Sequence, residues 1–144
     1  MDRAARRLAS ESNPGVRVWR AACPLAAVWF AGTAAACALV GITAHLGLVR
    51  DAKLKAGETL FVNGGTGGVG SMVVQMSKAI GARVVTTAGS AEKVALCREL
   101  GADAAINYKT ENVDERIRAF VPDGVNVWWE TLREPNFDQA VPLL

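Results

Sequence analysis

The sequence predicts an α/β fold built on a parallel β-sheet, and three observations support this. Short apolar stretches alternate with helical patterns from residue 51 onward. Glycines cluster between the first of these stretches and the helix that follows it. The length of 144 residues suits one domain with a sizeable core. A net charge of +2 gives no indication of nucleic-acid binding.

The first predicted strand and helix occupy Leu60–Gly81. Leu60–Val62 has the apolar composition of a buried strand, and Gly81 fits the position that follows a helix C-terminus. Apolar residues at spacings of four, three and four share one helix face: Val69, Val73, Met76 and Ile80.

Between this strand and helix, Gly65, Gly67 and Gly70 form the pattern G-x-G-x-x-G. In a dinucleotide site, the three glycines permit the tight turn, the close approach of a pyrophosphate and the packing of helix on sheet, respectively. A phosphate loop of the G-x-x-x-x-G-K-[ST] type is excluded because Ser71 stands where the lysine is required. A glycine-rich turn without a ligand is the alternative.

Further strands and helices alternate along the rest of the chain. Ser90 is a good N-cap for one of the helices, and Gly101 closes it. We therefore expect a partial Rossmann-type sheet over residues 51–144, with about four strands in the order 3-2-1-4 and helices on both faces. The predicted strands are Arg83–Thr87, Ala104–Tyr108 and Val125–Glu130, and the predicted helices are Ala91–Leu100, Val113–Phe120 and Phe137–Leu144.

The N-terminal third has a different composition. Residues 1–20 are polar and basic, and we expect them to be poorly ordered. Residues 21–49 contain no Asp, Glu, Lys or Arg, so residues 21–50 are predicted to be an apolar helical segment. Its length could span a bilayer, with Arg20 and Arg50 flanking it. Four residues interrupt the run and favour a buried helix, with a membrane segment as the alternative, namely Pro24, Gly32, Gly41 and His45.

The sequence gives little indication of a metal site or of a catalytic nucleophile. Cys23, Cys37 and Cys97 are widely spaced, and His45 is the only histidine. We predict no metal site from these residues and name no catalytic residue. Unpaired thiols suit a reducing compartment, so a cytoplasmic location is expected.

The predicted cofactor is NADP(H). An NAD site usually carries Asp or Glu at the end of the second strand, about 20 residues past the glycines. Here that strand ends in Thr87-Ala88-Gly89-Ser90, and Lys93 follows in the first helical turn. Small polar residues and a cation accept a 2′-phosphate, which a carboxylate would repel. Glu92 is the nearest acid and keeps NAD as the alternative.

Several motifs together resemble the medium-chain dehydrogenase/reductase superfamily. They include Gly41–Ala44, Asn63–Gly70, Gly89–Lys93, Glu99–Asp103 and Ile106–Tyr108, in that order. The variant is similar to the zinc-independent NADPH:quinone oxidoreductases, the group that includes ζ-crystallin, over roughly residues 32–144.

The resemblance implies roles for individual residues. Gly67, Gly68 and Val69 would lie against the pyrophosphate, and Thr43 near the nicotinamide. Three residues would hold the 2′-phosphate with Tyr108 completing the pocket, namely Gly89, Ser90 and Lys93. Thr43 as a buried helix threonine and Tyr108 as an aromatic at the sheet end are the structural alternatives.

The resemblance also implies an activity. NADPH would deliver a hydride to a quinone or enone, and a homodimer is a further expectation. The GroES-like catalytic domain of the family has no counterpart in the sequence, so we expect a fragment, with cofactor binding without turnover as the alternative. Trp129 or Glu130 could wall the nicotinamide side, although we favour core packing for one tryptophan and a solvent position for Glu130.

Overall fold

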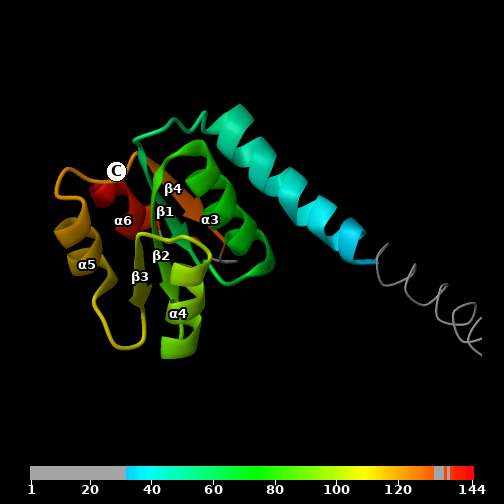
Figure 1. Ribbon diagram of the computed structural model, residues 1–144. Coiled ribbons are helices and arrows are strands. Elements are labelled where there is room, and N and C mark those ends of the chain that lie inside the picture. Colours follow the sequence, from blue (N-terminus) through cyan, green and yellow to red (C-terminus); the bar gives the residue numbers. More distant parts are fainter. Residues whose placement is uncertain (1–31, 132–134, 136) are drawn as a thin grey trace, which may run out of the picture. The chain divides into compact units, whose positions relative to one another are not determined.

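The computed structural model describes residues 32–131, 135 and 137–144. The chain divides between Leu39 and Val40, and each part is described by itself. Residues 32–39 are helical. The part that begins at Val40 contains the parallel sheet with its covering helices (Figure 1).

Strands and helices alternate through this second part, as the sequence predicts. The strands are β1 (Thr59–Asn63), β2 (Arg83–Ala88), β3 (Ala104–Asn107) and β4 (Val127–Glu130). The helical elements are η1 (Leu46–Asp51), α3 (Gly68–Ile80), α4 (Ala91–Glu99), α5 (Val113–Phe120), α6 (Phe137–Ala140) and η2 (Val141–Leu143).

The sheet has the order β3-β2-β1-β4, and every neighbouring pair of strands is parallel. Leu60 of β1 lies between Val84 of β2 and Val127 of β4. The chain first winds outward from β1 to β3 and then returns to the other side of β1. This confirms the predicted Rossmann-type topology and places the switch point, where ligands bind in such sheets, between β1 and β4.

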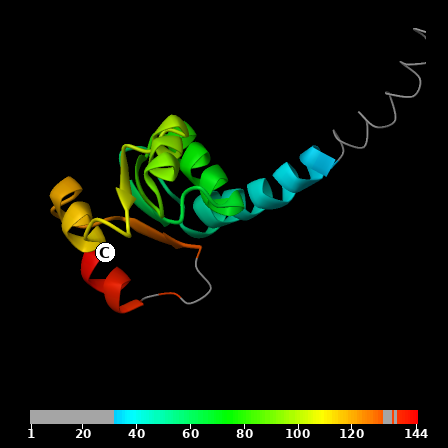
Figure 2. The same cartoon turned by 90° about the horizontal axis from the view of Figure 1, so that it is seen from below.

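Two apolar clusters cover the opposite faces of the sheet. The helices that contribute to them, α3 with α4 and α5, lie on the two sides of the sheet (Figure 2). Leu60 and Val62 of β1 pack against Val73 of α3 in one cluster. The intervening Phe61 packs with Ile117 of α5 in the other. Successive side chains of a strand point to opposite faces, so a continuous apolar strand such as β1 requires helices on both sides.

Two predicted boundaries differ from the structure at the C-terminal end. The fourth strand begins at Val127 because the Val125 N–H donates to the carbonyl of Leu143, in η2, at 2.7 Å. The predicted helix Phe137–Leu144 stays α-helical only to Ala140 and continues as a short 3₁₀ turn. Pro142 lies in this turn and has no N–H to continue the α-helical bonding.

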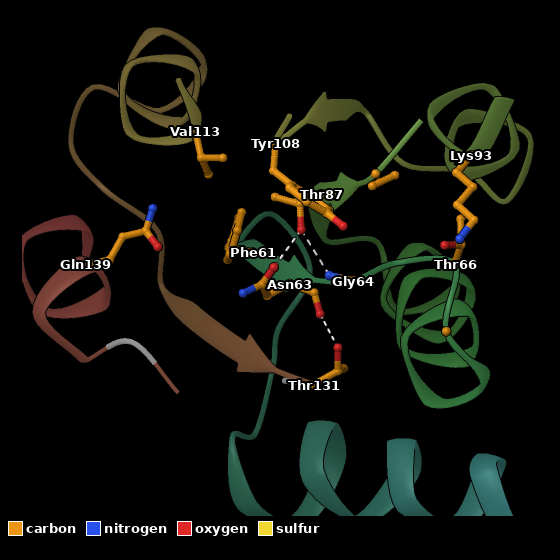
Figure 3. Close-up of a pocket in the computed structure, with 13 residues that line it drawn as sticks. Phe61, Asn63, Gly64, Thr66, Thr87, Lys93, Tyr108, Val113, Thr131 and Gln139 are labelled. Carbon is orange, nitrogen blue, oxygen red and sulfur yellow. Dashed lines mark hydrogen bonds between the residues drawn. The ribbon is translucent and has the colours of Figure 1, made fainter. Parts of the chain in front are cut away.

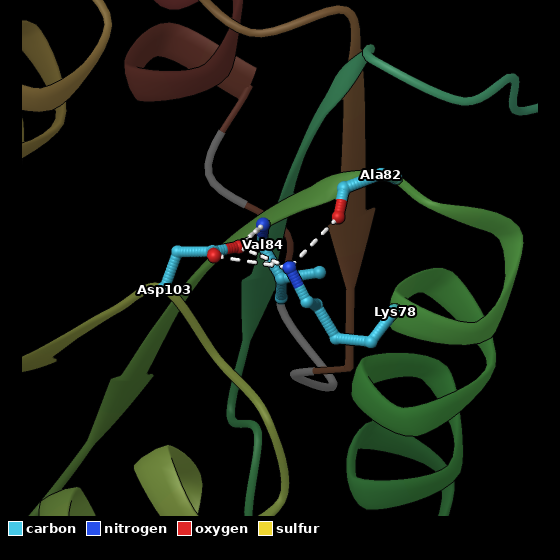
Figure 4. Close-up of polar contacts among 4 residues, drawn as sticks. All are labelled: Lys78, Ala82, Val84 and Asp103. Carbon is cyan, nitrogen blue, oxygen red and sulfur yellow. Dashed lines mark hydrogen bonds and ion pairs between the residues drawn. The ribbon is translucent and has the colours of Figure 1, made fainter.

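A polar tether closes the end of the sheet opposite to the switch-point crevice (Figure 4). Asp103 accepts hydrogen bonds from the Val84 N–H at 2.7 Å and from the Lys78 ammonium at 2.9 Å. The ammonium of Lys78 also donates to the Ala82 carbonyl at 3.2 Å. Partial burial raises the pKa of Asp103, but the hydrogen bonds from Lys78 and Val84 outweigh it, so the pKa lies below its ordinary value.

The apolar segment is helical where it is described. Helix Gly32–Asp51 is long and apolar enough to cross a membrane by length and composition. Gly41 and His45 do not interrupt it, and its last turn is the π-helical η1. Residues 1–20 and 21–31 lie outside the described residues, so the predicted limits of these segments stay predictions.

Candidate cofactor site

A cavity of about 520 Å³ opens where the carboxyl ends of β1, β2 and β3 meet the helices that follow them (Figure 3). Its lining combines an apolar floor with hydroxyl, amide and ammonium groups. The lining residues are Phe61, Asn63, Gly64, Thr66, Gly67, Thr87, Ala88, Gly89, Lys93, Tyr108, Val113, Thr131 and Gln139.

The glycine turn owes its shape to two positions. Gly64 has a φ of +85°, a backbone conformation that side-chain-bearing residues rarely adopt. A Cβ on Gly70 would lie 2.2 Å from the carbonyl oxygen of Gly64, so only glycine lets α3 start this close to the turn. The sequence predicts that Gly65 permits the turn. The residue with positive φ is Gly64, one position earlier, whereas Gly65 lies so close to β2 that a Cβ there would be 2.2 Å from the Thr86 hydroxyl oxygen.

Helix α3 begins directly beside the cavity. Gly67 is its N-cap, with extended backbone and no side chain to accept a bond from the first-turn N–H groups. The first turn contains no acidic residue. Because an uncapped helix N-terminus carries partial positive charge, this arrangement suits an anion such as a pyrophosphate.

The far side of the cavity contains the residues predicted to bind a 2′-phosphate. Gly89 follows β2, and a Cβ there would lie 2.6 Å from the hydroxyl oxygen of Tyr108, so the tyrosine hydroxyl lies directly above this turn. Lys93 lines the same cavity from the first turn of α4. Ser90 does not line the cavity. Its hydroxyl caps α4 by accepting a bond from the Lys93 N–H at 3.3 Å.

A second cavity, of about 440 Å³, lies on the β4 side of the glycine turn. Gly67 and Thr131 line both cavities, so the two meet at the turn. The second cavity is lined by Thr43, Gly67, Gly68, Val69, Gly70, Trp129, Glu130 and Thr131. The structure thus divides the predicted residues, with Thr43, Gly68, Val69 and Gly70 in the β4-side cavity and Lys93, Gly89 and Tyr108 in the other. Gly65 lines neither.

The end of β4 differs from what we favoured for Glu130. This residue is half-buried, and its carboxylate accepts bonds from Asn63 at 3.1 Å and from the Trp128 indole N–H at 3.4 Å. Trp128 packs on Phe61 in the core, with ring centroids 4.1 Å apart. Trp129 lies against Gly47 of η1, where a Cβ would come 2.2 Å from the indole ring. Glu130 is therefore not a solvated strand end but part of the crevice wall.

Sequence reasoning missed several polar residues at the crevice. Asn63, Thr87 and Thr131 line the first cavity from the ends of β1, β2 and β4. Asn63 stands in the motif that carries the family resemblance, but nothing in the sequence marked its side chain as part of the site. The only usable signal was position, since each residue falls at the carboxyl end of a predicted parallel strand.

The residues that the structure describes contain no group of three or more His, Cys, Asp or Glu side chains that could hold a metal ion. Burial raises the pKa of the Cys97 thiol, which a hydrogen bond with Thr86 lowers only in part. A buried thiol with a raised pKa is a poor nucleophile and a poor metal ligand.

Comparison with known proteins agrees with this geometry. Residues 68–144 match the family model described as "Zinc-binding dehydrogenase". Prostaglandin reductase 1 of Rattus norvegicus is 46% identical over 93 residues, which are 64% of this chain and 28% of that protein. A putative NADP-dependent oxidoreductase of Bacillus subtilis, YfmJ, is 44% identical over 108 residues, or 74% of this chain and 32% of that protein.

Solved structures give the same result. CurA of Vibrio vulnificus, crystallised in complex with NADPH, superposes with a TM-score of 0.66 and 37% identity over 72% of this chain and 31% of that one. A quinone oxidoreductase of Pseudomonas syringae superposes with a TM-score of 0.68 and 30% identity over 74% of this chain and 33% of that one. The chain belongs to the zinc-binding dehydrogenase family, in the zinc-independent NADPH oxidoreductase group of the medium-chain dehydrogenase/reductase superfamily.

The chain spans about a third of the length of the relatives it matches. The family-model match at residues 68–144 contains β2, β3 and β4. Residues 32–131, 135 and 137–144 contain no set of ligands that fits the zinc of the family description.

Proposed function

We propose that residues 51–144 are the NADP(H)-binding part of an oxidoreductase of the quinone-reductase type. The observation that carries the proposal is the first cavity, which places Lys93 and Tyr108 beside the turn at Gly89 while the glycine turn and the start of α3 bound the same space. A dinucleotide that crosses the β1–β4 switch point would run through this cavity into the second one.

Each part of the cofactor has a chemical counterpart in the two cavities. The Lys93 ammonium and the Tyr108 hydroxyl would hold the 2′-phosphate through charge-assisted hydrogen bonds. The amides at the start of α3 would receive the pyrophosphate. Thr43 and Trp129 would bound the nicotinamide end in the second cavity. Within the described lining of the first cavity Lys93 is the one charged side chain, which favours NADP(H) over NAD(H).

The proposed substrate is a quinone or an enone. NADPH supplies a hydride to such an acceptor, and the protein supplies binding and orientation. The residues of this chain bind and orient the cofactor, and none of the described residues is assigned as an acid, base or nucleophile. A cytoplasmic location and a homodimeric assembly are part of the same proposal.

The cofactor assignment is tested by Lys93→Glu. This variant places a carboxylate where the 2′-phosphate would bind, so NADPH affinity should fall by at least about tenfold, whereas NADH affinity should change by no more than about twofold. Fluorescence titration with both cofactors measures the two dissociation constants.

Lys55→Glu is the matched control because Lys55 is exposed in the loop before β1 and does not line either cavity. It makes the same change of charge and should leave both constants unaltered. Equal losses of NADPH and NADH affinity in Lys93→Glu would refute the 2′-phosphate role.

Two alternatives rest on specific observations. Because the chain spans about a third of its relatives, cofactor binding without turnover is the first. A quinone-turnover assay beside the NADPH titration distinguishes this alternative from reductase activity. Binding of NADPH without its oxidation would refute the reductase activity. The second is a membrane-anchored chain, which rests on helix Gly32–Asp51. Fractionation into soluble and membrane pools decides that point.

A further inference from the structure

A continuous set of hydrogen bonds joins the ends of three strands beneath the glycine turn. Figure 3 shows the two bonds of this set that Thr87 makes, with Gly64 and with Asn63. The Gly64 N–H donates to the Thr87 hydroxyl at 3.0 Å, and this hydroxyl donates to the side-chain oxygen of Asn63 at 2.7 Å. The side-chain amide of Asn63 then donates to the Glu130 carboxylate at 3.1 Å. The four residues come from the ends of β1, β2 and β4 and from the turn itself.

The carboxylate at one end fixes the direction of the whole set. An ionised carboxylate can only accept hydrogen bonds, so Asn63 must turn its NH₂ group toward Glu130 and its oxygen toward Thr87. The Thr87 hydroxyl has one hydrogen, which it gives to Asn63, and its oxygen therefore remains as an acceptor for the Gly64 N–H. Hydrogen bonds that point the same way also strengthen one another.

The Gly64 peptide is the part of the turn that needs this support. Gly64 has positive φ. Its carbonyl accepts a hydrogen bond at 3.1 Å from the N–H of Gly67, which is the N-cap of α3. The next amide, of Gly65, donates to the backbone carbonyl of Thr87 at 3.1 Å. Thr87 thus holds two successive amides of the turn and is only 2% exposed.

We propose that Thr87, oriented through Asn63 by Glu130, is a positioning residue that holds the glycine turn in the shape that receives the cofactor pyrophosphate. This inference rests on the proposed dinucleotide site. It concerns the pyrophosphate, which NADPH and NADH share, and it therefore predicts an effect that does not distinguish the two cofactors, unlike that of Lys93.

Thr87→Val keeps the side-chain shape and removes the hydroxyl, which leaves the Gly64 N–H and the Asn63 oxygen without their partner. The dissociation constants of NADPH and NADH should both rise by about tenfold, with their ratio constant within about twofold. Thr87→Ser retains the hydroxyl and should restore both constants to within about twofold of wild type. Thr59→Val makes the same substitution at an equally buried threonine, 3% exposed, at the opposite end of β1 and should change neither.

Amide hydrogen exchange at Gly64, measured without cofactor, gives a second reading. Exchange should be faster in Thr87→Val than in wild type and unchanged in Thr59→Val. Should Thr87→Val not fold, Asn63→Ala interrupts the same set at a half-buried position and should give both effects.

Two results would overturn the inference. In the first, wild type binds both cofactors and Thr87→Val binds them equally well. In the second, Gly64 exchanges at the same rate with and without the hydroxyl. Failure of wild type to bind either cofactor would instead refute the proposed dinucleotide site, and the exchange measurement would still decide whether Thr87 holds the turn.

Discussion

Two glycines at the start of α3 have different surroundings, although they lie only two residues apart. A Cβ on Gly70 would lie 2.2 Å from the Gly64 carbonyl oxygen and 3.2 Å from the Gly65 Cα, both of them backbone atoms. A Cβ on Gly68 would meet only the Val40 side chain, at 3.6 Å. The packing of the chain therefore requires glycine at Gly70 but not at Gly68.

Gly70→Ala should lower the free energy of unfolding by about 1–3 kcal/mol, because the backbone must shift to admit the methyl group. Gly68→Ala should be neutral or stabilise by up to about 1 kcal/mol, since alanine is the better helix residue. Urea denaturation of both variants measures the difference. Equal stability of the two would show that the close approach at Gly70 is wrong.

At the scale of residues, the sequence predicted which residues line the first cavity better than it predicted the hydrogen bonds beneath the glycine turn. Lys93 and Tyr108 were expected beside Gly89, and the first cavity contains all three. The bond from Thr87 to Asn63 was not expected, because it joins residues 24 positions apart and depends on the register of β1 and β2. A one-residue change of register between β1 and β2 would place the two side chains on opposite faces of the sheet.

At the scale of elements, the tether between Lys78 and Asp103 links α3, the start of β2 and the segment before β3. Both side chains are about one third exposed, which limits the strength of the ion pair. The bond to the Val84 N–H adds a contact to an amide at the start of β2. The tether should therefore stabilise the fold modestly without affecting the cofactor cavity at the opposite end of the sheet.

Asp103→Asn should lower the free energy of unfolding by about 1 kcal/mol at pH 7. The pKa of Asp103 is depressed in the folded state, so its contribution is fully present above the ordinary carboxyl pKa of about 4. It is lost as the pH falls through the lower pKa of the folded state. Denaturation at several pH values should thus show the two proteins converging in acid.

Asp123→Asn is the control for this prediction, because it removes the same charge from an exposed turn. It should have little effect on the free energy of unfolding at pH 7 or in acid. A difference between wild type and Asp103→Asn that is as large in acid as at pH 7 would contradict the assignment of the tether.

Element types followed from the alternation of apolar strands and helical patterns, because parallel strands need crossover helices on both faces. The strand order 3-2-1-4 followed from the Rossmann-type glycine motif, since the alternation alone is compatible with other orders. The element ends followed less well. Val125 pairs with the carbonyl of Leu143, which the pattern of residues 125–130 cannot reveal. The sequence predicts a solvent position for Glu130 because it does not reveal the register of β1 and β4, which places Glu130 opposite Asn63.

At the scale of the whole molecule, the chain contains a four-stranded parallel sheet and spans about a third of the length of its relatives. Both cavities open at the carboxyl edge of the sheet, and the Lys78–Asp103 tether lies at the other edge. Lys78 and Asp103 line neither cavity, so variants of these two residues should leave cofactor affinity unchanged.

The most direct test of the account is nuclear magnetic resonance of the ¹⁵N-labelled chain during titration with NADPH. Amide signals of Gly64–Gly70, Gly89–Lys93 and Tyr108 should shift, whereas those around Lys78 and Asp103 should stay in place. NADH should shift the glycine-turn signals but have a smaller effect at Lys93 and Tyr108. Absence of any shift with NADPH, or shifts confined to residues outside the two cavities, would contradict the account.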